Sequence, residues 1–313
     1  MTPRSTGLAA LVAVIWGLCF VLIQASLPSP APLLLAALRA LIGGGVLAAW
    51  VALRRSPPAA RQPRATPSDR ASRRSGYPSM PLLIALALAN GALALGAMYL
   101  AAGQAEAAVA SILGGGQPLV LATAGWAFFG ERASRRSVAG LAVAMVGIVL
   151  VATASSGATS PDGVALALLA TAAPAAGTVL MRRLAPTVDL FVTTSAQFLL
   201  GGAILLAASA VLEPWGSLSW SPAMLAGLLV LGVLGTGLAY VAWFWLLDRV
   251  SMVRLGAALF LVPVTGIVAA IVTGERPGAV ELAGIAAVLV GIGIVSVGGP
   301  SAPSAEEPGR QTA

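Results

Sequence analysis

Ten long runs of apolar residues limit what this chain can fold into. A helix needs about 20 apolar residues to cross a hydrocarbon core roughly 30 Å thick. Hydrophobic residues make up 58% of the 313 residues and charged residues only 9%, more apolar surface than a soluble domain could bury. We predict membrane spans at residues 7–24, 31–53, 80–102, 107–129, 137–154, 163–181, 190–212, 222–247, 253–273 and 279–298.

These runs indicate helices, because they are continuously apolar, whereas the strands of a membrane barrel would alternate. Helices also satisfy their backbone hydrogen bonds within each span. The predicted fold class is therefore an all-α integral membrane protein with ten transmembrane helices. The first run could be mistaken for a cleaved signal peptide, but nine further spans follow it and the repeat described below requires it.

The positive charges predict the orientation. The chain has no lysine or histidine, so its 18 basic residues are arginines, and its net charge is +7. With a cytoplasmic amino terminus, every arginine except Arg39 and Arg276 lies in a cytoplasmic segment, among them the Arg-rich loop 54–77. The positive-inside rule then predicts a multi-pass protein of the plasma (inner) membrane with both termini cytoplasmic. Charges placed this way argue against a nucleic-acid partner, and the expected partners are the lipid bilayer and a small-molecule substrate.

An internal repeat divides the chain into two halves. The segment that begins at Arg39 matches, without a gap, the segment that begins at Gln197, including a pair of glycines in each. Each half holds five spans, an odd number, so the two halves must enter the membrane from opposite sides. We predict a first repeat at 1–156, an inverted second repeat at 157–298 and a disordered cytoplasmic tail at 299–313. A second match aligns Pro118 and Gly130-Glu131-Arg132 with Pro263 and Gly274-Glu275-Arg276.

Inverted repeats place a substrate site near the bilayer midplane and permit alternating access. Pro118 and Pro263 interrupt equivalent spans, which makes them candidate hinges, although proline is also tolerated in spans for packing. Two glycine pairs spaced seven residues apart, Gly140 with Gly147 and Gly284 with Gly291, predict close helix contacts.

Polar and aromatic residues inside the spans are the candidates for substrate binding. Arg39 is the only charge well inside a span, where it costs at least ~2.5 kcal/mol unless it faces protein or water. Two hypotheses stay open: Arg39 holds a substrate carboxylate or phosphate, or it stabilises the fold by pairing with helix-end carbonyls or Glu106. Trp243 and Trp245 lie near a span end and fit interfacial anchors. The candidates are Trp16, Arg39, Asn90, Tyr99, Gln117, Gln197 and Tyr240.

The sequence lacks the residues that the common classes of membrane-embedded enzyme need for catalysis. The chain has no histidine, one cysteine (Cys19) and no acid pair inside a span, so we expect no metal, no cofactor and no catalytic site. No P-loop pattern is present, so an ATP-hydrolysing subunit is not expected. A membrane-embedded enzyme that uses only arginine, serine and tyrosine is the distant alternative.

Several short motifs, in their order and spacing, resemble the EamA family of the drug/metabolite transporter superfamily. They are Trp16-Gly17, Arg39, Pro118 followed by Phe129-Gly130-Glu131-Arg132, and Pro263 followed by Gly274-Glu275-Arg276. The resemblance implies ten helices, a central cavity formed by both halves, and export of amino acids, related metabolites or drugs.

Two departures from the family pattern indicate a more apolar cavity. Leu18 and Cys19 stand where the family often has Ser-Asn, and Pro174 stands where the repeat would place a tryptophan. The expected function is export of amino acids or related metabolites by alternating access. A hydrophobic drug or cation exporter and an uptake carrier for organic anions are the alternatives, and the sequence leaves the substrate, the coupling ion and the oligomeric state open.

Overall fold

In the computed structural model of the chain, every regular element of the described part is a helix. It describes residues 3–26, 30–54, 78–114, 116–117, 120, 135–154, 159–184, 188–247, 259, 261–274 and 276–297, and no β-strand occurs among them. The all-helical prediction is confirmed.

The first half contains eight described helical segments. The first span is divided at Leu18, and the third contains a π-helical segment, named η1, whose backbone hydrogen bonds reach one residue further than in an α-helix. The segments are α1 (Pro3–Gly17), α2 (Cys19–Ser26), α3 (Pro32–Arg54), α5 (Met80–Leu86), η1 (Ala87–Leu93), α6 (Ala94–Ala102), α7 (Ala107–Gly114) and α9 (Arg135–Ala154).

The second half follows the same plan. A π-helical segment, η3, again lies in the middle of its third long span. The segments are α10 (Pro161–Leu184), α11 (Leu190–Leu212), the short turn η2 (Trp215–Ser217), α12 (Pro222–Leu229), η3 (Val230–Leu238), α13 (Ala239–Leu247), α15 (Leu261–Val272) and α16 (Ala279–Val297).

Six helical stretches of the described chain are long and apolar enough to cross a membrane. They are Arg4–Ala25, Pro32–Arg54, Met80–Ala102, Pro161–Met181, Leu190–Leu212 and Pro222–Trp243. Val138–Val151, Leu261–Val272 and Ala279–Gly291 are shorter apolar helices. The predicted fourth span is described mainly as α7, and Pro118 lies outside the described residues, so the count of ten spans stays a prediction.

The two π-helical segments occupy matching places. In each case a short α-helix precedes the segment and a nine-residue α-helix follows it. Gly91 of η1 makes room for the backbone of Gly201, while Gly232 and Gly237 of η3 make room for the side chains of Ile42 and Val46. Because π-helical segments are rare and often occur at functional sites, η1 and η3 make these two spans candidates for the functional site.

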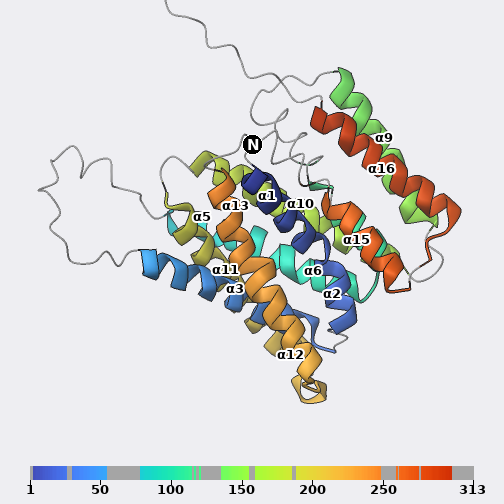
Figure 1. Ribbon diagram of the computed structural model, residues 1–313. Helices are drawn as coiled ribbons and strands as arrows, with labels where there is room; N and C mark the ends of the chain where they lie inside the picture. The colour runs from blue at the N-terminus through green and yellow to red at the C-terminus, as the bar shows by residue number, and fades with distance from the viewer. Residues whose placement is uncertain are drawn as a thin grey trace, which may run out of the picture.

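Helices α9 and α16 are in direct backbone contact, and Figure 1 shows them side by side. A methyl group built on Gly140 would lie 2.9 Å from the Gly291 carbonyl oxygen, and one built on Gly147 would lie 2.6 Å from the Gly284 carbonyl oxygen. No side chain fits at such distances, so all four glycines are needed at this crossing. The seven-residue spacing predicted close helix contacts, and the structure shows that these two helices make theirs with each other.

Helices α3 and α11 form a second extensive contact, and its details recur with the two halves exchanged. A methyl group on Gly44 would meet the Leu199 side chain at 3.0 Å, and one on Gly202, the repeat equivalent of Gly44, would meet Leu41 at 2.9 Å. Leu41 and Leu199 are themselves equivalent in the register that aligns Arg39 with Gln197.

The exchange extends to the π-helical segments. Gly43 of α3 faces Thr236 of η3, where an added methyl would lie 2.5 Å from the threonine side chain. Its equivalent, Gly201 of α11, faces Gly91 of η1 at 2.6 Å. Each π-helical segment therefore packs against the second long helix of the other half.

Glu213 fastens α11 to α3. Its two carboxylate oxygens accept hydrogen bonds from the backbone amides of Leu33 (2.6 Å) and Leu34 (2.9 Å), and from the Ser209 hydroxyl (2.5 Å). A carboxylate at a helix amino terminus satisfies free amides and complements the helix dipole. This contact holds the start of α3 against the end of α11.

Candidate functional site

Arg39 is buried in the protein interior on α3, with 4% of its surface exposed. Its guanidinium donates from Nε to Thr236 Oγ1 at 3.1 Å, from Nη2 to Cys19 Sγ at 3.4 Å and from Nη1 to Met98 Sδ at 3.6 Å. The partners come from η3, α2 and α6, so both halves of the chain surround the charge. We call Cys19, Arg39, Met98, Tyr99 and Thr236 the arginine cluster.

The arginine cluster contains no counter-charge. No acidic side chain pairs with Arg39 in the described part of the chain, and Glu106 is not among its partners. Its hydrogen bonds go to a hydroxyl and two sulfur atoms rather than to helix-end carbonyls. The pairing expected from the structural hypothesis is therefore not observed, and a buried positive charge is left with weak neutral acceptors.

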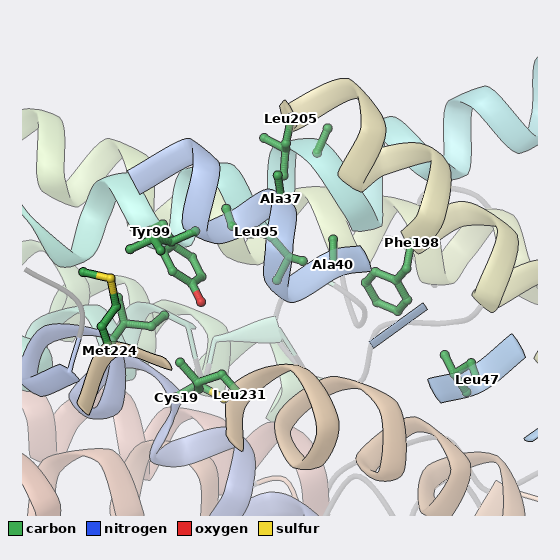
Figure 2. Close-up of a cluster of buried hydrophobic side chains, with 14 residues drawn as sticks. Cys19, Ala37, Ala40, Leu47, Leu95, Tyr99, Phe198, Leu205, Met224 and Leu231 are labelled. Carbon is green, nitrogen blue, oxygen red and sulfur yellow. The ribbon is translucent and has the colours of Figure 1, made fainter. Parts of the chain in front are cut away.

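Tyr99 adds an unused hydroxyl beside this charge. The side chain is 3% exposed, its hydroxyl oxygen lies beside the Arg39 guanidinium and interacts with it, and its hydroxyl hydrogen is donated to no atom of the described residues. Figure 2 shows the hydroxyl pointing from α6 into the buried cluster on the side of Cys19 and Leu231. A buried hydroxyl without a partner costs roughly 1–3 kcal/mol, so this one stands out as available for a ligand.

Gly235 leaves room next to the guanidinium. A methyl group built on Gly235 would lie 3.5 Å from Cys19 Sγ and 3.6 Å from Arg39 Nη2, and both are ordinary contact distances. At most other interhelical glycines of this chain an added methyl would overlap backbone or side chain. The arginine cluster therefore has free space of at least a carbon atom's size on the η3 side.

A neutral cluster occupies the equivalent place in the second half. Gln197, aligned with Arg39, accepts a 3.0 Å hydrogen bond at Oε1 from Asn90 Nδ2 of η1. Both amides are buried, and Asn90 also fills the space in front of Gly177, the position aligned with Cys19. Repeat-equivalent sites thus hold a paired amide in one half and an unpaired cation in the other.

An aromatic wall stands next to the arginine cluster. The Trp16 ring packs against Tyr240 and Trp243 with ring centroids 5.7 and 5.3 Å apart, and Tyr240 packs against Phe198 at 5.1 Å. Trp16 Nε1 also donates to the Gly235 carbonyl oxygen at 3.1 Å. Trp243 therefore belongs to this wall, besides any role at the membrane interface.

Not every candidate joins these groups. Gln117 is half-buried, and no described contact connects it to the other candidates. Pro263 is buried in α15, which packs on α1: a methyl on Gly17 would meet the Val262 carbonyl oxygen and, at 2.8 Å, Thr265 Cβ. The described geometry therefore gives Pro263 a place at a helix contact and leaves its hinge role a prediction.

Four residues of the site were missed by sequence reasoning: Cys19, Met98, Gly235 and Thr236. Cysteine and methionine are common in apolar spans and carry no signal of their own. Thr236 had one, since it is a hydroxyl between two glycines in the middle of an otherwise apolar run.

The model of the EamA-like transporter family matches residues 5–153 and 162–297. An uncharacterized transporter, YvbV, of Bacillus subtilis is 27% identical over 94% of this chain and 92% of that protein. A probable amino-acid metabolite efflux pump of Salmonella typhimurium is 28% identical over 93% of this chain and 94% of that protein.

A crystal structure supports the fold. It matches with a TM-score of 0.64 and 19% identity, covering 95% of this chain and 98% of that one. At this identity the likeness concerns the fold alone.

Proposed function

The chain belongs to the EamA-like transporter family, and from that premise we propose that it exports amino acids or related metabolites by alternating access. As a member of a transporter family with membrane-spanning apolar helices, it is a multi-pass membrane protein. The finer points, namely substrate class, direction, ten spans and inverted repeats, are parts of the proposal.

The observation that carries the proposal is the exchange of contacts between the halves. Gly44 packs on Leu199 as Gly202 packs on Leu41, while Gly43 faces η3 and Gly201 faces η1. The family model also matches two successive segments. This pattern supports two repeats related by a pseudo-twofold axis, and an odd number of spans in each repeat makes them inverted.

Inverted repeats allow the two halves to exchange conformations around a central site. The arginine cluster draws on α2, α3 and α6 of the first half and η3 of the second, so relative movement of the halves would remodel it. A solute bound there would be exposed first to one side and then to the other. Direction is set by coupling, because alternating access itself is reversible.

The amino-acid class has two supports. The Salmonella relative is named as a probable amino-acid metabolite efflux pump. In this chain, a buried guanidinium next to an aromatic wall offers a carboxylate partner and an apolar surface together.

The test is ligand-dependent thermal stabilisation of the purified protein with a panel of amino acids, organic acids and hydrophobic cations. A ligand that binds the native state raises the melting temperature with its concentration. We expect zwitterionic or anionic members of the panel to stabilise the protein. Stabilisation by hydrophobic cations alone would contradict the amino-acid proposal.

Export of hydrophobic cations is the second candidate, favoured by the aromatic wall of Trp16, Tyr240 and Trp243, because aromatic faces attract cations. The uncompensated charge of Arg39 opposes it. An uptake carrier for organic anions would use the same cluster and differ only in coupling. For either direction, we propose the plasma membrane with both termini cytoplasmic.

A further inference from the structure

We propose that the arginine cluster is an anion-binding site that takes the carboxylate group of a small solute, between the Arg39 guanidinium and the Tyr99 hydroxyl. The inference rests on the proposed function and gives its substrate a chemical class. It assigns the contacts with the anion to two groups, the Arg39 guanidinium and the Tyr99 hydroxyl.

The first ground is the missing counter-charge. A buried cation without an anionic partner carries a large desolvation cost, because weak acceptors replace the water it has lost. Arg39 meets one hydroxyl and two sulfur atoms in the described structure, and sulfur is a weak acceptor. An incoming anion would supply the missing partner.

The second ground is the unused hydroxyl of Tyr99. It is buried, it interacts with Arg39, and it donates to no atom of the described chain. The Cys19 thiol and the Thr236 hydroxyl already donate to the backbone carbonyl oxygens of Ile15 and Leu231, so the donors left for a ligand are the guanidinium and the phenol. Among the described residues no carboxylate pairs with Arg39. A buried guanidinium beside a phenol hydrogen that no described atom accepts suits an anion and disfavours a cation.

The third ground is space. The open side of Gly235 borders both the guanidinium and Cys19, and it would accept a methyl group at ordinary contact distance. A planar carboxylate suits the guanidinium fork, which binds two parallel oxygens. Chloride shares the negative charge but not this planar geometry, so we assign the site to a carboxylate.

The second repeat provides an internal comparison. Where the first half has Arg39, the second has Gln197, whose side chain is already bonded to Asn90. The same location in the fold is therefore neutral and self-satisfied when no anion is to be bound. Arg39→Gln removes the charge and keeps a polar side chain, as in the second repeat, although no amide partner is among the described neighbours of Arg39.

The probe is acetate, which is a carboxylate without the rest of a substrate. The melting temperature of the purified full-length protein is measured while sodium acetate replaces sodium chloride at constant total salt. For the wild type we expect a saturable rise, and for Arg39→Gln only the general salt effect, with apparent affinity lowered at least about 30-fold. Arg54→Gln, the same substitution at the far end of α3, should respond like the wild type.

Tyr99→Phe keeps the proposal testable if Arg39→Gln does not fold. Removing a buried hydroxyl without a partner should leave stability in chloride unchanged or higher. The apparent acetate affinity should fall roughly three- to tenfold, the value of one hydrogen bond. Under a purely structural role of Tyr99 the acetate response would be untouched, and that result would overturn the assignment.

The other outcomes of the acetate titration also test the proposed site. An acetate response that is equal in wild type and Arg39→Gln would overturn the site, and an Arg39-dependent preference for chloride would replace the carboxylate with a free inorganic anion. The proposed function fails separately: acetate binding with no solute movement in proteoliposomes leaves the site standing without the transport proposal. If Arg39→Gln still moves amino acids across the vesicle membrane, the transport proposal stands and the anion site at Arg39 is wrong.

Discussion

At the scale of single residues, rarity is what made the site visible in the sequence. Arg39, Asn90, Tyr99 and Gln197 are polar groups in long apolar runs, and the structure buries all four. Cys19, Met98 and Gly235 could not be found this way, because small and apolar residues fill every span and only a tertiary contact distinguishes them. Sequence therefore predicted which groups need an explanation, while the structure supplied their pairing.

Gly235→Ala tests the free space beside Arg39. The added methyl fits at 3.5–3.6 Å, so we expect the free energy of unfolding to change by no more than ~0.5 kcal/mol. Because it would occupy ligand space, apparent acetate affinity should fall by about tenfold, equivalent to ~1.4 kcal/mol. Gly45→Ala, on α3 with nothing within 4 Å, is the matched control. Equal acetate affinities in the two variants would refute the assigned space.

At the scale of elements, hydropathy predicted the positions of these spans well, but it did not predict where the backbone hydrogen bonding changes from α-helical to π-helical. The expected spans 190–212 and 222–247 coincide with α11 and with the run from α12 to α13. Nothing in an apolar run distinguishes α- from π-helical hydrogen bonding, since both bury the same side chains. The segments η1 and η3 were therefore unpredictable from composition, although they carry Asn90 and Thr236 into the interior.

The contact between η1 and α11 can be tested through the Asn90–Gln197 hydrogen bond. Asn90→Leu or Gln197→Leu alone leaves a buried amide without its partner, at a cost of ~1–3 kcal/mol. The double variant should recover a coupling energy of about 0.6–1.7 kcal/mol, measured by unfolding in mixed micelles. Combining Asn90→Leu with Thr153→Val, at an exposed site on α9, should give additive effects. Additivity in the first cycle would show that the amides are not coupled.

The crossing of α9 and α16 depends on glycine. In Gly147→Val the new Cβ would lie 2.6 Å from the Gly284 carbonyl oxygen, so the two helices must separate. We expect a loss of about 1–3 kcal/mol in the free energy of unfolding. Gly45→Val introduces the same side chain on a helix face with open space and should cost far less. Similar losses in both variants would mean that the crossing is not tight in the folded protein.

At the scale of the whole molecule, the internal repeat was the most useful prediction from the sequence. The register that aligns Arg39 with Gln197 led directly to equivalent contacts in the structure. The asymmetry between the halves could not be predicted, because it depends on which neighbours each residue meets. The arrangement of helices around the interior is shown in Figure 1.

Orientation in the membrane can be measured by cysteine labelling. With Cys19→Ser removing the single native thiol, Ser217→Cys and Ser304→Cys each introduce one new site. The positive-inside rule predicts that an impermeant maleimide labels Ser217→Cys in intact cells, and Ser304→Cys only after permeabilisation. The reverse pattern would invert the proposed topology, and labelling of both in intact cells would rule out a cytoplasmic tail.

The central claim is that this chain moves a carboxylate-bearing solute through a site built around Arg39. Counterflow in proteoliposomes tests it most directly: vesicles preloaded with an unlabelled amino acid from the stabilising set are diluted into a trace of the labelled one. We predict transient accumulation of label with the wild type and with Arg54→Gln, and at least about a tenfold lower initial rate with Arg39→Gln. Accumulation no greater than in protein-free vesicles, for every amino acid that stabilises the protein, would contradict the account.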